Sequence, residues 1–389
     1  MKYHIITFGC QMNLSDSERM ARLLKRAGGK ESSLAEADLV LVNMCSVRQS
    51  AVDRVLGLRE KLKGKKTVLA GCVLDKDKKN FDFFDKILPV KSLGHYLKII
   101  PLYESKFSAV VPIMTGCNNF CSYCVVPYTR GPEKCRESKD ILREITSLVK
   151  KGYKEIWLLG QNVNSYKSFP QLLTAIDKIS GNFWIRFTSS HPKDFSDKLI
   201  YAMKTLKKVT PYLNLPVQAG DNSVLKAMNR PYNIGQYKEA ILKVRKEIPN
   251  ITISTDIIVG FPGETKKQFQ NSAKFFNEMG YDMAYISEYS KRAGTKASLL
   301  KETVSQEEKK KRKIMLNNIL IKTAMQRNRK YVGKTVDVLI SKKLKDNAYA
   351  GKTREYKDIK VSSSKNIIGK FVKAKVISAS SFSLRGKLL

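Results

Sequence analysis

Three cysteines lie close together in the stretch CNNFCSYC, which covers residues 117–124. Three residues separate Cys117 from Cys121, and two separate Cys121 from Cys124. A structural zinc ion takes four ligands, usually in CxxC pairs, so this set is one ligand short. Iron–sulfur clusters are also held by Cys thiolates, and three thiolates on a four-iron cluster would leave one iron open to a reactant. We therefore interpret the three cysteines as ligands of a four-iron cluster with one open iron. The alternative is a zinc site with a fourth ligand from a distant part of the chain.

Three further cysteines each end a short run rich in β-branched residues: YHIITFGC ends at Cys10, ADLVLVNMC at Cys45 and KKTVLAGC at Cys72. A single free cysteine is most often a buried core residue. If these runs are parallel strands of one sheet, however, their carboxyl ends share the edge at which open α/β sheets bind ligands. We therefore predict a second three-cysteine site. The seventh cysteine, Cys135, is interpreted as a thiol without a ligand role.

The elements around these cysteines suggest three domains. Residues 1–104 alternate the three runs with helical stretches such as SDSERMARLLKRAG, which predicts an open parallel α/β sheet. Residues 105–325 repeat strand and helix six times, which favours an incomplete (β/α) barrel over a flat doubly wound sheet. The predicted strands are 109–116, 153–160, 183–190, 212–218, 251–260 and 281–290. CNNFCSYC follows the first of them, at the end of the barrel where chemistry is done.

Residues 326–389 begin with the end of a long charged helix and continue as short β segments, which predicts a small antiparallel β-barrel. Basic charge is concentrated here. The chain has 72 Lys and Arg against 35 Asp and Glu. Residues 331–389 alone have 14 against 4, and residues 301–330 have 10 against 3. A lysine-rich composition would spread this excess evenly, so we expect a polyanionic partner such as nucleic acid.

A membrane partner is not favoured by the sequence. No apolar run approaches the roughly 20 residues that span a bilayer. The start, MKYHIITFGC, lacks the basic flank and long apolar core of a secretory signal. We expect a cytoplasmic protein, and thiols in that compartment stay reduced and more often bind metal than form disulfides.

The cysteine spacing, with Tyr123 directly before the last cysteine, resembles the radical S-adenosylmethionine (SAM) superfamily. In that superfamily SAM binds the open iron, and an electron from the cluster cleaves it to a 5′-deoxyadenosyl radical. The order of the three domains resembles the methylthiotransferase family over essentially the whole chain. The last module of that family is the RNA-binding TRAM domain, and GKTREYKDIKV (351–361) is similar to its signature hairpin.

This resemblance implies two 4Fe–4S clusters, and SAM both as methyl donor and as radical source. Cys117, Cys121 and Cys124 would hold the radical SAM cluster, and Cys10, Cys45 and Cys72 an auxiliary cluster. FGCQMN, NMCSVRQSA and CSYCVVPYTRG are similar to the branch that methylthiolates carbon 2 of isopentenylated adenosine beside the tRNA anticodon. The alternatives are threonylcarbamoyladenosine of tRNA, an aspartate of a ribosomal protein, or a non-catalytic RNA-binding zinc protein.

The resemblance also implies partners and further site residues. The partners are a tRNA anticodon stem-loop, a flavodoxin-like or ferredoxin-like electron donor, and a sulfur donor or cluster-assembly protein, with the enzyme itself a monomer. The implied SAM-binding residues are Tyr123, Gln161, Asn162, Ser190, Gly260 and Gly263. The implied RNA-binding residues are Lys352, Arg354, Lys357 and Arg385. For the two glycines, an ordinary turn is the alternative.

Two arginines follow the cysteine loop, Arg130 and Arg136. Their guanidinium groups could bind the carboxylate of SAM or an RNA phosphate in bidentate fashion. A solvated surface position is the alternative for both.

Overall fold

The computed structural model describes residues 1–47, 49–92 and 96–389. The chain forms two compact units. Unit 1 comprises Met1–Ile145, Leu158–Asn162 and Ser290–Leu299. Unit 2 comprises Thr146–Trp157, Val163–Tyr289 and Leu300–Leu389. This division does not follow the boundaries 1–104, 105–325 and 326–389, which stay predictions.

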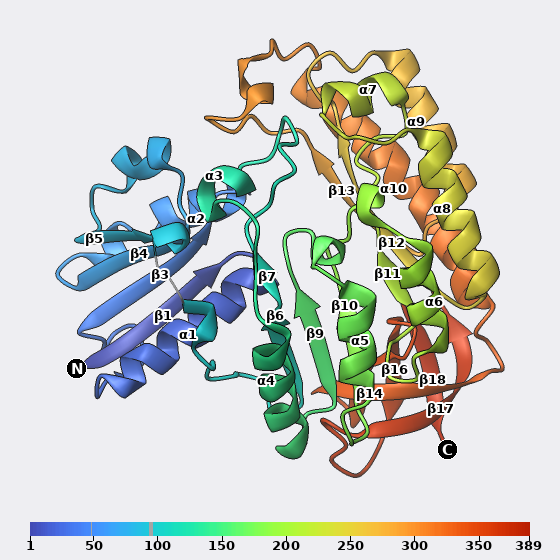
Figure 1. The fold of residues 1–389 in the computed structure, drawn as a ribbon, viewed down its shortest axis with the longest axis horizontal. Helices are drawn as coiled ribbons and strands as arrows, with labels where there is room; N and C mark the ends of the chain where they lie inside the picture. The colour runs from blue at the N-terminus through green and yellow to red at the C-terminus, as the bar shows by residue number, and fades with distance from the viewer. Residues whose placement is uncertain (48, 93–95) are drawn as a thin grey trace. The chain divides into compact units, whose positions relative to one another are not determined.

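Unit 1 contains the predicted open parallel sheet, drawn in blue in Figure 1, and its strand order is β2-β1-β3-β4-β5. The strands are β1 (Lys2–Phe8), β2 (Lys30–Glu31), β3 (Leu39–Cys45), β4 (Lys66–Cys72) and β5 (Lys86–Pro89). All neighbouring pairs are parallel. The helices α1 (Gln11–Arg26) and α2 (Gln49–Leu56) connect strands of this sheet. Arg48 of the NMCSVRQSA motif, and residues 93–95, lie outside the described residues.

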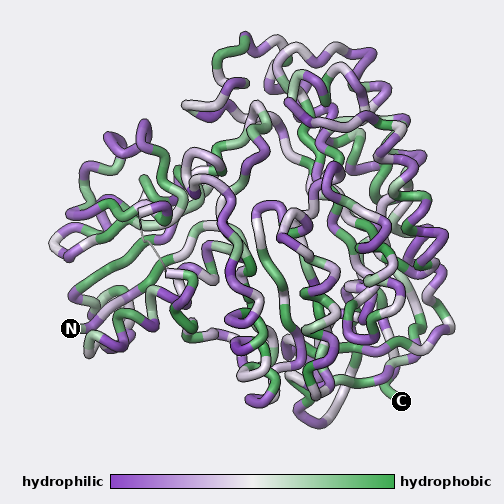
Figure 2. The backbone as a smooth tube through the Cα atoms, viewed as in Figure 1, coloured by the Kyte–Doolittle hydropathy of each residue, from purple (hydrophilic) through white to green (hydrophobic). Residues whose placement is uncertain are grey.

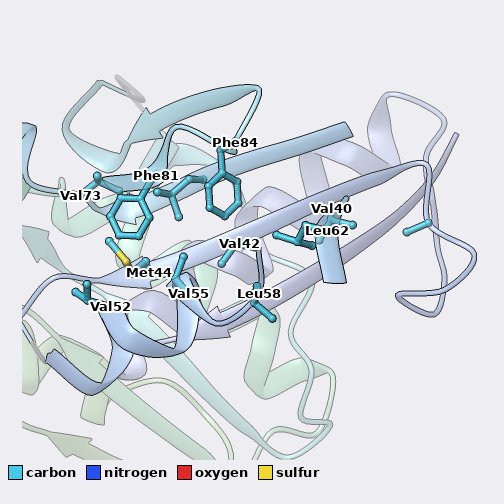
Figure 3. Close-up of a cluster of buried hydrophobic side chains, with 12 residues drawn as sticks. Val40, Val42, Met44, Val52, Val55, Leu58, Leu62, Val73, Phe81 and Phe84 are labelled. Atoms are coloured by element: carbon cyan, nitrogen blue, oxygen red, sulfur yellow. The ribbon is translucent and has the colours of Figure 1, made fainter. Parts of the chain in front are cut away.

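The core beside α2 explains why these runs become strands. Val40, Val42 and Met44 of β3 are completely buried, and they pack with Val55 of α2 and with Phe81 (Figure 3). β3 has the sequence LVLVNMC, in which all residues except Asn43 are hydrophobic. Figure 2 colours hydrophobic residues of the chain green. Burying one such side chain stabilises the fold by roughly 1.5–3 kcal/mol. A parallel strand buried on both faces therefore has a nearly continuous apolar sequence.

The six strands predicted for residues 105–325 are confirmed, with the first divided in two by Ile113. They are β6 (Ser108–Pro112), β7 (Met114–Thr115), β9 (Glu155–Leu159), β10 (Trp184–Phe187), β11 (Tyr212–Asn214), β12 (Thr252–Val259) and β13 (Met283–Glu288). In unit 2, β11, β12 and β13 form a parallel sheet. A parallel bridge between Ile185 and Val209 continues this set towards β10. In unit 1, β8 (Lys134–Cys135) pairs with β7 and places Cys135 opposite Met114.

Helices separate these strands, as the alternating pattern predicts. They are α3 (Val126–Arg130), α4 (Ser138–Lys150), α5 (Phe169–Asp177), α6 (Asp197–Thr205), α7 (Asn222–Ala227), α8 (Ile234–Glu247) and α9 (Lys266–Met279). The start of α9 shows the local cause: Thr265 Oγ1 accepts from the Gln268 backbone N–H at 3.2 Å, and the Gln268 side chain accepts from the Thr265 backbone N–H. Such a capping box satisfies two backbone donors at a helix start. No described helix is long and apolar enough to cross a membrane.

The last part of unit 2 is the long helix α10 (Gln306–Arg329) followed by a closed five-stranded barrel, drawn in orange to red in Figure 1. The barrel order is β14-β15-β16-β18-β17. The strands are β14 (Thr335–Lys343), β15 (Ala348–Thr353), β16 (Asp358–Ser362), β17 (Phe371–Ala379) and β18 (Leu384–Leu388). The barrel is not fully antiparallel as expected, because β16 and β18 pair in parallel to close it.

Arg186 of β10 attaches this barrel to the rest of unit 2. Its side chain is completely buried and donates to Glu155 at 2.6 Å and to Thr210 Oγ1 at 3.0 Å. It also donates to the backbone carbonyls of Thr353 and Arg354, both at 2.9 Å. Because these carbonyls belong to the last residue of β15 and the residue after it, one buried cation orients the barrel within the unit.

Candidate cysteine sites and basic surface

Cys10, Cys45 and Cys72 come together in unit 1, at one edge of the parallel sheet. Cys45 and Cys72 are the last residues of β3 and β4 and are direct partners in the strand register. Cys10 lies two residues beyond β1, at the start of α1. The Cys45 side chain lies near enough to the Cys10 and Cys72 thiols for their ionisation to be coupled. The sheet thus assembles three thiols from residues that are far apart in sequence.

The electrostatics of this site favour the thiolate form of two of the cysteines. The hydrogen bond from the Cys45 side chain lowers the pKa of Cys10 to about 5. The same kind of bond from Cys45 lowers the pKa of Cys72, while these bonds raise the pKa of Cys45 itself. The thiolate is the form of cysteine that binds metals.

Two buried asparagines support this edge, and the sequence analysis did not single them out. Asn13 Nδ2 donates to Asn43 Oδ1 at 3.1 Å and to the Met44 carbonyl at 3.2 Å. Asn43 Nδ2 donates in return to the Asn13 carbonyl at 2.7 Å. Asn13 Oδ1 also accepts from the Cys10 backbone N–H at 3.2 Å. A polar Asn43 within the apolar run LVLVNMC was the available signal, because such a residue needs a buried partner.

Cys117, Cys121 and Cys124 lie on the loop after β7, also in unit 1. Cys117 and Cys121 are buried and Cys124 is half-buried. Backbone N–H groups donate to two of the sulfurs, from Asn119 to Cys117 Sγ at 3.4 Å and from Val126 to Cys124 Sγ at 3.5 Å. Hydrogen bonds of this kind stabilise sulfur that carries negative charge. Burial nevertheless raises the pKa of the Cys117 thiol, so these N–H donors offset only part of the cost of a buried thiolate.

Gly116 sets the course of this loop. Its φ is +77°, and a Cβ atom there would lie 2.1 Å from the Pro132 carbonyl oxygen. Only glycine fits such a position without moving the backbone. The contact brings the chain entering the loop against the chain leaving it, and the Cys117 N–H donates to the Gly131 carbonyl at 3.2 Å.

The donors of both sites suit iron–sulfur clusters in their chemistry. Among residues 1–47, 49–92 and 96–389, no three His, Cys, Asp or Glu side chains converge so as to hold a single metal ion. The three thiolates of a 4Fe–4S cluster bind different irons, so a set of three cysteines suits a cluster with an open iron without converging on one ion. The lowered pKa of Cys10 and Cys72, and the N–H donors to Cys117 and Cys124, both favour the charged sulfur that such a cluster needs.

Arg130 is buried and Arg136 is half-buried, so neither is a solvated surface arginine. Arg130 donates to Cys72 Sγ at 3.1 Å and to Asp16 at 2.7 Å. Arg136 donates to Glu144 at 2.6 Å and to the Pro112 carbonyl at 2.8 Å. The structure assigns both guanidinium groups to partners within unit 1.

The predicted SAM-binding residues lie at strand ends of both units. Tyr123 and Gln161 are half-buried in unit 1, and Asn162 is buried beside Gln161. In unit 2, Ser190 follows β10, and its buried hydroxyl has no hydrogen-bond partner among the described residues. The following imidazole, His191, has its pKa lowered to about 2 by burial and is neutral.

Gly260 and Gly263 shape the turn after β12 in unit 2. Both have positive φ, +70° and +85°. The Gly260 N–H donates to Glu264 at 2.6 Å, and the Gly263 N–H donates to Thr303 Oγ1 at 2.9 Å. Both glycines therefore have a conformational role, which leaves their SAM-binding role a prediction.

The predicted RNA-binding residues have unequal exposure. Lys357 is buried and pairs with Asp282 at 2.6 Å, so we assign it to the interior of unit 2 rather than to an RNA contact. Arg354 is half-buried and donates to the carbonyls of Lys207 and Val209. Lys352 pairs with Asp358 at 2.8 Å, and both side chains remain partly exposed.

Arg385 is exposed and belongs to a wider basic surface on the barrel. In the strand register, Arg385 lies beside Lys360 on one side and Ser378 on the other. Two residues further along β18, Lys387 lies opposite Lys375. We call Lys360, Lys373, Lys375, Arg385 and Lys387 the basic face, and all five residues are exposed. The alternation FVKAKVIS was the sequence signal for Lys373 and Lys375, which we did not predict.

Comparison with known proteins identifies three successive regions. Residues 2–88 match Uncharacterized protein family UPF0004, residues 111–276 match the Radical SAM superfamily, and residues 329–389 match the TRAM domain. A curated relative from Thermoanaerobacter sp. (strain X514) is 39% identical over 100% of this chain and 92% of its own length. One from Caldicellulosiruptor saccharolyticus is 40% identical with the same coverage. Both are named tRNA-2-methylthio-N(6)-dimethylallyladenosine synthase.

Solved structures share the fold at low sequence identity. The radical S-adenosylmethionine methyltransferase TsrM from Kitasatospora setae, with cobalamin and a [4Fe-4S] cluster bound, is 12% identical with a TM-score of 0.55. The similarity covers 76% of this chain and 77% of that chain. At this identity the likeness supports the fold alone.

Proposed function

This chain belongs to the family of tRNA-2-methylthio-N(6)-dimethylallyladenosine synthases, and we propose that it adds a methylthio group to carbon 2 of isopentenylated adenosine on the 3′ side of the tRNA anticodon. It is a radical SAM transferase. The observation that carries the proposal is that six cysteines form two sets of three in unit 1, within a chain that matches such enzymes over its whole length.

The cofactors that the family implies are 4Fe–4S clusters and SAM. Cys117, Cys121 and Cys124 would hold the cluster that supplies the electron for SAM cleavage. The chain's own residues prepare that site, since N–H groups of the loop point at two of the sulfurs. Burial of Cys117 and Cys121 also keeps water away from it.

Cys10, Cys45 and Cys72 would hold the auxiliary cluster, which would supply the sulfur of the methylthio group. The Asn13–Asn43 pair fixes the edge on which these residues lie. In unit 2, the unpartnered Ser190 hydroxyl and the neutral His191 could hydrogen-bond SAM or the target base. Tyr123, Gln161 and Asn162 in unit 1, and Gly260 and Gly263 in unit 2, are each proposed to contact SAM.

The TRAM barrel supports binding of tRNA. We propose that the basic face contacts its phosphates, with Lys352 and Arg354 beside it. Single-stranded anticodon bases can be turned outward without breaking a duplex, which makes a loop adenosine a suitable target. A flavodoxin-like or ferredoxin-like donor, a sulfur donor, a monomeric state and a cytoplasmic location remain parts of this proposal.

The proposal is tested by iron content and by product analysis. Anaerobically reconstituted protein should contain about eight irons, falling to about four when Cys117, Cys121 and Cys124 are all changed to alanine, because each set holds one four-iron cluster. Cys121→Ala should abolish SAM cleavage. Cys45→Ala should retain SAM cleavage and lose methylthiolation of tRNA. Methylthiolation by the Cys45→Ala variant would refute the role of the auxiliary site.

The choice of substrate is tested separately. Nucleoside mass spectrometry should find the 2-methylthio product on tRNA that carries isopentenyladenosine. It should find none on tRNA that carries threonylcarbamoyladenosine, and none on ribosomal protein. A zinc-containing, colourless protein would instead support a non-catalytic role.

A further inference from the structure

Arg130 is a buried arginine that lies between the two sets of cysteines within unit 1. It is the last residue of α3, the short helix that follows Cys124. Only 5% of the residue is exposed. A charge at this depth is costly unless it is paired and hydrogen-bonded, so its partners are informative.

Each part of the guanidinium group has a different partner from the first hundred residues. Nε donates to Cys72 Sγ at 3.1 Å, Nη2 donates to Asp16 at 2.7 Å, and Nη1 donates to the Tyr96 hydroxyl at 3.4 Å. Both charged side chains of the Arg130–Asp16 pair are essentially inaccessible to water. Cys72 is thereby the one cysteine of its set that directly contacts a cation in the described structure.

The next residue contacts the other set of cysteines. The carbonyl of Gly131 accepts the backbone N–H of Cys117 at 3.2 Å. Two consecutive residues therefore contact both sites, Arg130 through its side chain and Gly131 through its backbone. A displacement of Cys72 would therefore reach Cys117 through the peptide that joins Arg130 and Gly131.

The charges at Cys72 have a predictable effect on a bound cluster. Reduction potentials of iron–sulfur clusters depend on net charge and on hydrogen bonds to the sulfurs. A cation that donates to a ligand sulfur stabilises the more negative, reduced form. The guanidinium group donates directly to Cys72 Sγ, whereas the Asp16 carboxylate is hydrogen-bonded to a different nitrogen of that group and not to the sulfur, so the cation has the larger effect.

We propose that Arg130 is a positioning residue for the auxiliary cluster. Arg130 makes the reduction potential of that cluster more positive, and it holds Cys72 against the loop of the radical SAM cluster. This inference rests on the proposed function, because it requires a cluster on Cys10, Cys45 and Cys72. It differs from the expectation that Arg130 binds SAM or RNA.

The experiment isolates the auxiliary cluster. The background is the full chain with Cys117, Cys121 and Cys124 changed to alanine, reconstituted with iron and sulfide. Arg130→Lys keeps the charge and loses the planar donor group. Arg130→Met leaves Asp16 without its cation, and Arg130→Met with Asp16→Asn removes both charges together and avoids a buried unpaired carboxylate.

The readout is the midpoint potential from a redox titration followed by electron paramagnetic resonance. The expected order, from most positive to most negative, is background, Arg130→Lys, Arg130→Met with Asp16→Asn, and Arg130→Met. The matched control is Lys357→Met with Asp282→Asn, which neutralises a buried ion pair in unit 2, where none of the six cysteines lies. Its potential should equal that of the background.

The outcomes separate the two proposals. If every variant contains about four irons and the midpoint potential is the same in all of them, the role of Arg130 is overturned and the proposed function stays intact. Absence of a cluster from the background itself would overturn the proposed function, and this inference with it. A potential that shifts equally in the control would also overturn the inference, because the shift would then report general loosening of the fold.

Discussion

Replacing Arg186 by methionine should destabilise unit 2 far more than replacing an exposed cation. The Arg186 side chain is completely buried and pairs with Glu155 at 2.6 Å. It also satisfies Thr210 and the carbonyls of Thr353 and Arg354. Methionine fills a similar volume but leaves the carboxylate and both carbonyls without this donor.

The magnitude follows from these contacts. Removing one partner of a buried ion pair costs about 3–5 kcal/mol, because the remaining charge stays buried and uncompensated. With a urea m-value of about 3 kcal/mol/M for a unit of this size, the unfolding midpoint should fall by about 1–1.7 M. The matched control is Lys204→Met, since Lys204 pairs with Glu247 at 2.9 Å with 51% of its side chain exposed. Such a pair contributes about 0–1 kcal/mol.

Tryptophan fluorescence is the appropriate assay because the chain has two tryptophans, and both lie beside Arg186. The guanidinium carbon is 5.8 Å from the Trp157 ring centre and 5.0 Å from the Trp184 ring centre. In urea titrations, the unfolding curves of wild type and Lys204→Met should coincide. The curve of Arg186→Met should be shifted to lower urea concentration. An Arg186→Met midpoint equal to that of the control would refute the claim that this cation attaches the barrel.

Three other predictions follow from single positions. Gly116→Ala should reduce the bound iron by about half, because the new Cβ would lie 2.1 Å from a backbone carbonyl oxygen and would displace the loop of one four-iron site. The control is Gly152→Ala, since Gly152 also has positive φ but has open space around it. Equal iron content in the two variants would contradict the reasoning. Burial raises the pKa of Glu18 to about 7, so the folded state retains a proton that the unfolded state releases near pH 4.5, and stability falls as pH rises from about 4.5 to about 7. Glu18→Gln should therefore raise the urea midpoint at pH 8 more than at pH 5, and an equal gain at both would refute this assignment. Changing Lys375 and Lys387 to glutamine should weaken tRNA binding and reduce the slope of log affinity against log salt by about 0.7–0.9 per lysine, measured by filter binding, whereas an unchanged slope would exclude them from phosphate contacts.

The sequence by itself determined the classes of element and the chemistry that they present. The runs before Cys45 and Cys72 are apolar and rich in β-branched residues, a composition typical of strands that are buried on both faces of a parallel sheet. Parallel strands end at one edge, so the convergence of these cysteines could be inferred before any coordinates. The concentration of lysine and arginine after residue 301 likewise indicated the region that binds nucleic acid.

Tertiary structure alone decided the roles of individual charged residues. Arg130, Arg186 and Lys357 are indistinguishable in sequence from surface cations, yet each is buried against a carboxylate from a distant segment. The parallel closure of the barrel by β16 and β18 was also hidden, because strand direction depends on how the chain returns rather than on the strand's own residues. Local sequence sets what a segment can form, whereas the cost of burying a charge is settled only by the partner that the fold brings to it.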